Sequence, residues 1–299
     1  VSLSLDSTAS SQIGVFQLNS NAQLSSTSGG GILADTYTIS GPDGSTTITT
    51  TAGDSAKEMA ARLNGVTGTT GVSATAVNKV KLHSLSAADT LQLTINGTQT
   101  ASVAITDATD LRNLRDTINL NSGTTGVVAS LHDGSNAALM LVDVDGDDIA
   151  ISLQAVTNAT ELEMAALNAD GTLADSSVTA DDLNVKLVDT GGTAAAGTTA
   201  VGATLIATGI VAVESYAAFN IQVANDSADY DEAANGTITA DGEFFGDGDG
   251  GATSTSSGTQ TTVSTVSVTT QANAEAALAI IDGALDKLNN QRAKLGAMS

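Results

Sequence analysis

Apolar residues between positions 36 and 155 recur with two periods, and each period predicts a different kind of element. Two short segments carry apolar residues at i, i+3 and i+7, the spacing that places them on one face of an α-helix. They are Ala56, Met59 and Leu63 in one segment and Leu111, Leu114 and Ile118 in the other. Asp54 is a candidate N-cap for the first helix, and Asp107 or Thr109 for the second, because short polar side chains accept hydrogen bonds from free backbone N–H groups.

Around these two segments the apolar period becomes two, which is typical of half-buried strands. The alternating residues are Tyr37 and Ile39, Val80 and Leu82, Leu91, Leu93 and Ile95, Val103 and Ile105, Leu139 and Leu141, and Ile149 and Ile151. Gly, Asn and Asp gather between them at 41–44, 96–97, 133–134 and 145–146. These residue types tolerate a positive φ, so the four sites predict tight turns between strands.

An internal repeat links the two helical segments. The residues Asn64, Gly68-Thr69-Thr70-Gly71-Val72 and Ala74 recur 55 positions later as Asn119, Gly123-Thr124-Thr125-Gly126-Val127 and Ala129. Each copy has the order hairpin, helix and further strands. The sequence therefore predicts two related β-α-β modules.

The patterns after residue 155 are weaker. Leu162, Ala165 and Ala166 fall on one helical face, with Thr160 as a candidate cap, so a short helix is expected at 160–167. Strand candidates follow at 185–187, 205–213 and 219–223. The run of Gly, Asp and Ser at 242–258 has no periodicity and predicts a flexible loop.

The last thirty residues carry a heptad pattern. Its apolar positions step alternately by four and three residues and are interrupted only by an arginine; they are Ala274, Leu278, Ile281, Leu285, Leu288, Arg292 and Leu295. Such a stripe is typical of a helix that packs against another helix. No earlier segment supplies a comparable long helix, so the expected partner is another chain or a segment outside this sequence. The alternative is an ordinary amphipathic helix lying on a domain surface.

The charge of the chain narrows the choice of partners. With 33 acidic and 10 basic side chains the formal net charge is -23, which repels the phosphates of nucleic acids and the anionic surface of membranes. We therefore expect neither nucleic acid nor membrane as a partner, and solubility is the ordinary explanation of the charge. No apolar stretch approaches the ~20 residues of a membrane-spanning helix. The absence of Cys excludes disulfides and thiolate metal sites.

The sequence offers little that predicts catalysis. It contains no phosphate-binding loop, nucleophile elbow, zinc-protease motif or dinucleotide fingerprint. The two histidines, His83 and His132, are 49 positions apart and so are not equivalent in the 55-residue repeat. Both are expected to be ordinary strand residues. We therefore predict that the chain is not an enzyme.

A calcium site is the one metal site that the sequence suggests. Four carboxylates surround the turn at Gly146; they are Asp143, Asp145, Asp147 and Asp148, and Asp247 and Asp249 repeat the theme later. Oxygen ligands of this kind suit Ca²⁺, but the EF-hand pattern, with its Glu at position 12, is absent. Turn aspartates that simply contact water are the alternative. No other cofactor is expected.

The C-terminal segment resembles a known family. Residues 272–299, above all Asn289-Asn290-Gln291-Arg292-Ala293-Lys294-Leu295-Gly296-Ala297, resemble the C-terminal core segment of bacterial flagellins. The paired modules around 68–72 and 123–127 are similar to a repeat in the variable region of flagellins and hook-associated proteins. The resemblance covers about half of the chain and leaves 160–260 without a family signal.

The resemblance implies a function and a role for the heptad. In flagellins the C-terminal helix pairs with N-terminal helices that this sequence lacks, so we expect a fragment that also lacks the extreme C-terminus and does not polymerise alone. The packing residues are then Leu278, Ile281, Leu285, Leu288 and Leu295, with Gln291 and Arg292 as polar contacts that fix the register. The implied partners are other flagellin subunits in a homopolymer, outside the cell in the flagellum or at the cell surface.

The predicted fold class is α+β, with strand-rich variable domains and short repeated β-α-β modules on a helical coiled-coil stalk. The expected segments are an entry segment (1–35), two repeat modules (36–90 and 91–155), a variable strand-rich region (156–262) and the core helix (263–299). The expected function is that of a structural, secreted subunit of the flagellar filament, serving motility. The alternatives are a hook-associated junction protein and a flagellin-like adhesin that binds polysaccharide or a host surface, where Lys79 and Lys81 are clustered basic residues.

Overall fold

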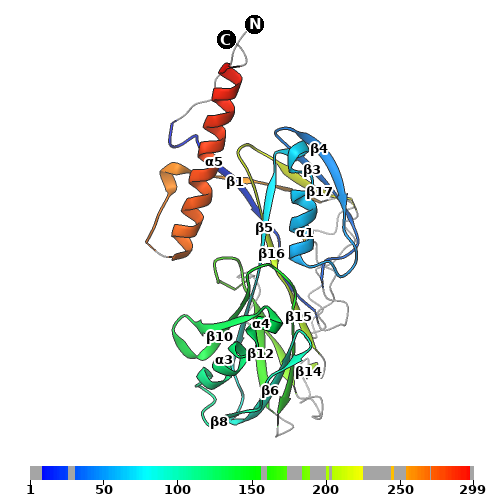
Figure 1. Cartoon of the computed structure of the whole chain (residues 1–299), viewed down its shortest axis with the longest axis vertical. Helices are drawn as coiled ribbons and strands as arrows, with labels where there is room; N and C mark the ends of the chain where they lie inside the picture. The colour runs from blue at the N-terminus through cyan, green and yellow to red at the C-terminus, as the bar shows by residue number, and fades with distance from the viewer. Residues whose placement is uncertain are drawn as a thin grey trace.

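The computed structural model describes residues 9–25, 31–155, 160–173, 184–188, 200–201, 204–224, 244–245, 254–269 and 271–296. The described chain is rich in strands and has few helices (Figure 1). The helices are α1 (Ala56–Asn64), α2 (Thr67–Thr70), α3 (Arg112–Asn119), α4 (Ser122–Thr125), the 3-10 helix η1 (Val263–Thr265) and the long α5 (Gln271–Gly296). The α+β class and the strand-rich character predicted from the sequence are therefore confirmed.

The strands of the described part of the chain form three sheets. The first ten strands are β1 (Gly14–Asn19), β2 (Gln23–Ser25), β3 (Thr36–Gly41), β4 (Gly44–Thr49), β5 (Ser73–His83), β6 (Asp89–Ile95), β7 (Thr98–Gln99), β8 (Val103–Ile105), β9 (Val128–His132) and β10 (Ser135–Asp143). The remainder are β11 (Ile149–Ala155), β12 (Glu161–Ala166), β13 (Asn184–Val188), β14 (Ala200–Val201), β15 (Leu205–Thr208), β16 (Ile210–Ser215), β17 (Asn220–Val223), β18 (Ser254–Ser257) and β19 (Thr259–Thr262).

The largest sheet has nine strands in the order β14-β13-β12-β5-β16-β1-β19, with β10 beside β5 and β9 beside β10. A six-stranded sheet has the order β2-β15-β11-β6-β7, with β8 on β6, and a four-stranded sheet has the order β18-β17-β3-β4. Among the residues that the structure describes, all strand pairs are antiparallel except β13 with β14, which is parallel. Strands far apart in sequence thus lie side by side, as β1 does with both β16 and β19.

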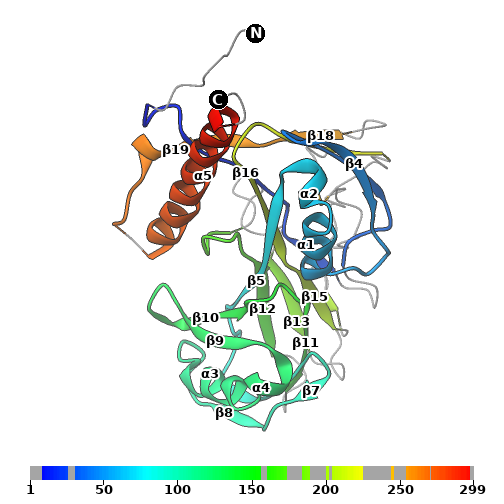
Figure 2. The same cartoon turned by 45° about the horizontal axis from the view of Figure 1, so that its top comes forward.

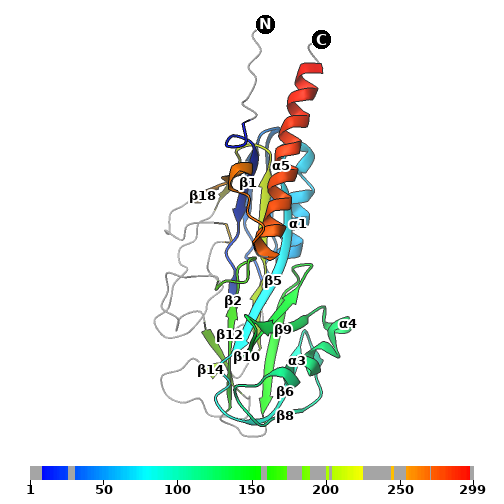
Figure 3. The same ribbon diagram turned by 90° about the vertical axis from the view of Figure 1, so that its left-hand side faces the viewer.

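The described residues form two hydrophobic cores that hold these sheets together, and the long strand β5 contributes to both. We call them the α1 core and the α3 core, after the helix that each contains. Ala74, near the start of β5, is buried in the α1 core with Met59 and Leu63. Val80 and Leu82, near its end, are buried in the α3 core. Figure 3 shows β5 running from the level of α1 down toward β9 and β10.

Both cores combine residues from several of the predicted segments. The α1 core includes Tyr37 from the first module and Val211, Ile221 and Phe244 from the region predicted to be variable. The α3 core includes Leu24 from the entry segment together with Leu114 from the second module. The sheets and cores therefore combine distant parts of the chain. The boundaries between the predicted segments stay a prediction made from the sequence.

The two copies of the sequence repeat have the same local geometry. In the first copy the Asn64 side chain bonds both backbone groups of Ala74, and in the second Asn119 does the same with Ala129. Gly71 and Gly126 end α2 and α4 with φ of 71° and 77°, a left-handed conformation that costs glycine little. The two copies are therefore a repeat in structure as well as in sequence. Figure 2 shows their two helix pairs, α1 with α2 and α3 with α4.

Two sequence expectations about helices are wrong. Residues 161–166 form strand β12, because Leu162 and Met164 alternate with Glu161 and Glu163 and point into the α3 core. β12 pairs with β5 on one side and β13 on the other, so its backbone groups are satisfied in the sheet.

The predicted caps are also replaced by neighbours. Ser55, not Asp54, caps α1 in a capping box with Glu58, while Asp54 binds Arg62. Leu111 occupies the N-cap position of α3 and has no side-chain cap bond, so neither Asp107 nor Thr109 caps that helix. Asp107 instead accepts hydrogen bonds from both the backbone and the hydroxyl of Thr109.

The run predicted as a flexible loop is partly a strand. Residues 254–257 form β18, which pairs with β17 along its length. Phe244 and Phe245 are 1% exposed and pack edge to face in the α1 core. The rest of the run, including Asp247 and Asp249, lies outside the described residues.

Candidate assembly surface

The C-terminal helix α5 is the element on which the sequence predicted a function. It packs on strand β1, and its C-terminal turns rise above the sheets (Figures 1 and 3). The predicted helix is therefore present over 26 residues. Among the residues that the structure describes, no second long helix lies against it, so the coiled-coil stalk stays a prediction.

One face of α5 is buried against the chain itself. Ala277, Ile280 and Ala284 are 4 to 5% exposed, at the i, i+3, i+7 spacing of a single helical face. Gly283 belongs to this face, because a Cβ there would lie 2.7 Å from the Cβ of Val15. The helix therefore reaches β1 through small side chains, which allow a close approach of the two backbones.

The predicted heptad stripe lies on a different face and is largely exposed. Leu278 is 65% exposed, Leu285 51%, Ile281 44% and Leu295 43%. Leu288 and Gln291 are half-buried, and Arg292 is exposed. Large apolar side chains in one row on a helix are unusual at a protein surface, since each loses contact with other apolar groups. The apolar residues of the heptad thus form a stripe with most of its area free; we call it the α5 stripe.

Sequence reasoning missed the face that the chain uses for its own packing. It identified the large residues of the α5 stripe, whereas the buried face consists of Ala, Gly and one Ile. The available signal was the spacing of Ala277, Ile280 and Ala284, which is as regular as the heptad. Lys287 Nζ also donates to the Gln12 carbonyl oxygen (2.8 Å), which ties the middle of α5 to the segment before β1.

Three of the four aspartates of the predicted calcium site are held by protein groups, and the fourth, Asp148, has a buried Oδ1 atom without a hydrogen-bond partner. The Asp143 Oδ1 atom accepts hydrogen bonds from the backbone N–H groups of Asp145 (3.0 Å) and Asp147 (3.4 Å). Asp147 and Asp145 face Lys57 Nζ at 2.7 and 3.6 Å. In the described part of the chain no group of three or more such side chains is arranged to hold a metal ion, so the structure gives the calcium prediction no support.

The two histidines sit in different surroundings. His83 Nδ1 lies 3.5 Å from Glu163 Oε2 and 2.7 Å from the Ser84 hydroxyl. His132 Nδ1 lies 3.1 Å from Asp133 Oδ2, and its Nε2 lies 3.3 Å from the Gly171 carbonyl oxygen. Each side chain is thus bound to near neighbours, as expected for strand residues.

The two basic residues considered for binding an anionic polysaccharide, Lys79 and Lys81, both lie on strand β5. Lys79 donates to the Ala169 carbonyl oxygen and is occupied within the chain. Lys81 is half-buried on the same strand.

Among the helices that the structure describes, none has the length and apolar character of a membrane-spanning helix.

The first repeat module matches a known family. Residues 38–89 match the family model described as the flagellin hook IN motif, which here spans β3, β4, α1, α2 and β5. The predicted resemblance to flagellins is therefore confirmed over this module. No curated protein matches the chain.

Two solved structures show a weak likeness to about two thirds of the chain. One contains the D2–D3 domains of the flagellar cap protein FliD from Escherichia coli, with 11% identity and a TM-score of 0.19, covering 68% of this chain and 98% of that chain. The other contains the D1–D2–D3 domains of the same protein, with 11% identity and a TM-score of 0.19, covering 67% of this chain and 64% of that one. Likenesses at this TM-score do not define a common fold and carry no argument about function.

Proposed function

We propose that this chain is a structural part of the bacterial flagellum, a surface-exposed region of a filament subunit that joins other subunits through the α5 stripe. The observation that carries the proposal is the row of exposed Leu and Ile on α5 in a chain whose residues 38–89 match the flagellin hook IN motif. Motility, secretion and an extracellular location belong to the same proposal. A structural role requires no catalytic group, and the two histidines described above have ordinary partners.

The physical basis is the apolar area that a second helix would cover. Burying one Leu or Ile side chain contributes roughly 1.5–3 kcal/mol, so the four exposed Leu and Ile side chains of the stripe supply a substantial part of the free energy of a helix–helix contact. Gln291 and Arg292 lie within the same heptad and are proposed to fix the register of that contact. The expected partner is a helix of a flagellar subunit, either of the same chain type or of the terminal segments that flagellins supply.

The test compares two substitutions that each add one negative charge to an exposed position of α5. Leu285→Asp interrupts the α5 stripe, whereas Ala293→Asp lies beside it on the solvent-facing side of the helix. The subunit that carries this chain is seeded with filament fragments and its growth is followed by electron microscopy. We expect Leu285→Asp to abolish growth and Ala293→Asp to leave it near the parent level. Equal growth of both variants would show that the stripe is not an assembly surface.

A hook-associated junction protein is the second candidate, because the matched family is described by its hook motif. A junction protein caps or joins filaments without forming long polymers of its own. If the parent subunit binds filament ends but does not extend them, this candidate replaces the first. Nothing that the structure describes favours the polysaccharide-binding adhesin, and it is not part of the proposal.

A further inference from the structure

The second copy of the sequence repeat exposes large apolar side chains at positions where the first copy has small or polar residues. Leu120, at the end of α3, is 82% exposed, and Val128, the first residue of β9, is 53% exposed. The equivalent residues of the first copy, 55 positions earlier, are Gly65 and Ser73. Because the two copies have the same local geometry, the backbone does not require a large apolar side chain at either position.

The exposed apolar side chains of the second copy are neighbours. Leu120 and Val128 flank the contact between an asparagine side chain and a backbone that joins α3 to β9. Val128 is opposite Val142 of β10, and residues directly opposite each other in an antiparallel pair point to the same side of the sheet. Val144, just after β10, is 73% exposed. We call these four residues, Leu120, Val128, Val142 and Val144, the β9 patch.

The β9 patch is on the side of the sheet that faces away from the α3 core. Leu141 of β10 is buried in that core, so Val142, the next residue along the strand, points the other way. In the first copy the residue opposite Ser73 is Glu214, whose carboxylate accepts a hydrogen bond from Gln17 (2.7 Å). A pair of valines thus replaces a polar pair. Clustered apolar side chains on an exposed face of a sheet mark a contact surface.

The border of the β9 patch toward β5 is positively charged. Lys79 of β5 is opposite Val142, and Lys81 follows on the same side of the sheet. Lys79 donates to a backbone carbonyl oxygen, and Lys81 forms no hydrogen bond or ion pair with any residue that the structure describes. At the other border, Asp145 lies 3.6 Å from Lys57 Nζ. The patch therefore combines an apolar centre with a cationic border.

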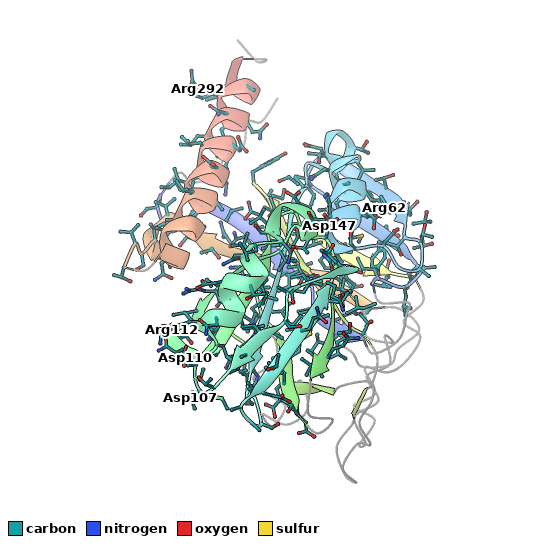
Figure 4. The ribbon with its side chains drawn as sticks, turned by 60° about the horizontal axis from the view of Figure 1, so that its bottom comes forward. Arg62, Asp107, Asp110, Arg112, Asp147 and Arg292 are labelled. Carbon is teal, nitrogen blue, oxygen red and sulfur yellow. The ribbon has the colours of Figure 1, made fainter. Side chains whose placement is uncertain are left out.

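A second copy of this chain has the complementary charge. With 33 acidic and 10 basic side chains, its surface is predominantly acidic, so two copies repel each other except where a positive border meets that surface. Other basic side chains of the described sheets and short helices are held by carboxylates, as Arg112 is by Asp110 (Figure 4). Lys79 and Lys81 therefore direct an acidic neighbour to the side of the β9 patch.

The size of the β9 patch limits the strength of this contact. A stable protein–protein interface buries about 800 Å² on each partner, far more than four aliphatic side chains provide. Free copies in solution are therefore not expected to pair through the patch. Two copies that another contact already holds side by side have a high effective concentration, and a weak contact then forms between them.

We propose that the β9 patch is a second contact surface for a neighbouring copy of this chain, formed once the α5 stripe holds the copies together. The inference rests on the proposed function, because the α5 contact supplies the high effective concentration. The β9 patch then stabilises the assembled filament but is not required for its growth. The two repeat copies have different roles, since only the second presents an apolar face to the neighbouring subunit.

Spin labelling tests the contact, because this chain contains no Cys and an introduced thiol is its single labelling site. Val128→Cys places the label in the β9 patch, and Ser102→Cys, at an exposed position between β7 and β8, is the control. The labelled subunit is seeded with filament fragments, growth is verified by electron microscopy, and label mobility is measured by electron paramagnetic resonance before and after growth. We expect the label at 128 to become immobilised in filaments and the label at 102 to stay mobile.

The outcomes separate this inference from the proposed function. If filaments grow and the label at 128 stays mobile in them, the inference is overturned and the proposed function stands. A label at 128 that is already immobilised in the free subunit also overturns it, because another part of the subunit then covers the patch. If the parent subunit forms no filaments, the proposed function fails and this inference fails with it.

An exchange of residues between the two copies tests the effect on stability. Leu120→Gly combined with Val128→Ser gives the second copy the residues of the first. We expect filaments of this double variant to grow but to depolymerise on heating at a lower temperature than parent filaments, whereas Asn113→Ala, at an exposed position of α3 outside the patch, should leave that temperature unchanged. Urea unfolding of the free subunit checks that the double variant folds; if it does not, the spin labels decide. An unchanged depolymerisation temperature in a folded double variant would overturn the proposal.

Discussion

The side chain of Asn64 bonds both backbone groups of Ala74: Nδ2 donates to the carbonyl oxygen and Oδ1 accepts from the N–H, each at 2.8 Å. The same pair recurs between Asn119 and Ala129. This contact joins the end of a helix to the start of the next strand within each repeat. It explains why asparagine, which supplies both a donor and an acceptor, occupies that position in both copies.

Asn64→Asp is expected to lower the free energy of unfolding by about 1 kcal/mol, because the Ala74 carbonyl oxygen loses its donor and faces a carboxylate instead. Asn119→Asp should have an effect of similar size. Asn113→Asp, at an exposed position of α3, is the control and should change stability little. Urea unfolding followed by circular dichroism gives the free energy of unfolding of all three variants. An unchanged free energy of unfolding in Asn64→Asp would mean that the contact contributes nothing to stability.

The glycines of the repeated Gly-Thr-Thr-Gly sequence have different roles. Gly71→Ala is expected to destabilise the chain by roughly 1–3 kcal/mol, because φ is +71° and the new Cβ would lie 2.5 Å from Asp43 Oδ2. At Gly68 a Cβ meets nothing within 4 Å, so Gly68→Ala should be neutral or slightly stabilising. Melting temperatures of the two variants test this, and the reverse order would contradict the geometry.

The two apolar faces of α5 should respond differently to truncation. Ile280→Ala removes a side chain that is 4% exposed and packed toward β1. It should therefore weaken the packing of α5 on β1 by roughly 2–4 kcal/mol. Leu278→Ala removes one that is 65% exposed and should cost less than about 0.5 kcal/mol in the isolated chain. Limited proteolysis near 271–296 reports the docking. Equal protease sensitivity of the two variants would mean that α5 is not held by the face described here.

Asp148 should also affect global stability with a definite sign. Its folded pKa, about 7, is above the unfolded value, so between pH 4 and 7 the folded state binds a proton that the unfolded state has released. This contribution to stability is present at low pH and is lost as pH rises toward 7, at a limiting slope of ~1.4 kcal/mol per pH unit.

Asp148→Asn removes that dependence. The stability of Asp148→Asn relative to the parent should therefore increase from pH 5 to pH 7.5, as measured by urea unfolding at each pH. Asp282→Asn, at an exposed position of α5, is the control and should show a constant difference over the same range. A difference that decreases with pH for Asp148→Asn would place the folded pKa of Asp148 below its unfolded value.

Local patterns in the sequence were sufficient for most elements of the two modules. The spacing of Ala56, Met59 and Leu63 placed α1, and the alternation through Leu91, Leu93 and Ile95 placed β6. The turns at Asn96 and Asp133 adopt the positive φ that their residue types predicted, 48° and 50°. These features depend on neighbours within a few residues, which is the range over which periodicity and turn chemistry act.

The capping and strand errors arose where a tertiary partner outweighed a local preference. Residues 161–166 are compatible with one helical turn in isolation, but β5 and β13 provide backbone partners on both sides and the α3 core accepts Leu162 and Met164. Asp54 is a good cap residue by type, yet Arg62 one helix length away binds it and leaves the cap to Ser55.

By itself the sequence determined the elements of the repeats, the heptad of α5 and the resemblance to flagellins, because each depends on the type and spacing of residues close together in the chain. Only the tertiary structure decided which face of α5 packs on β1 and which stays exposed, since both faces have helical spacing and the choice depends on the shape of a strand more than 250 residues away. The tertiary structure alone also placed the loop of Asp148 on α1. The pKa of this buried carboxyl group depends on neighbours that come together only when the two cores form.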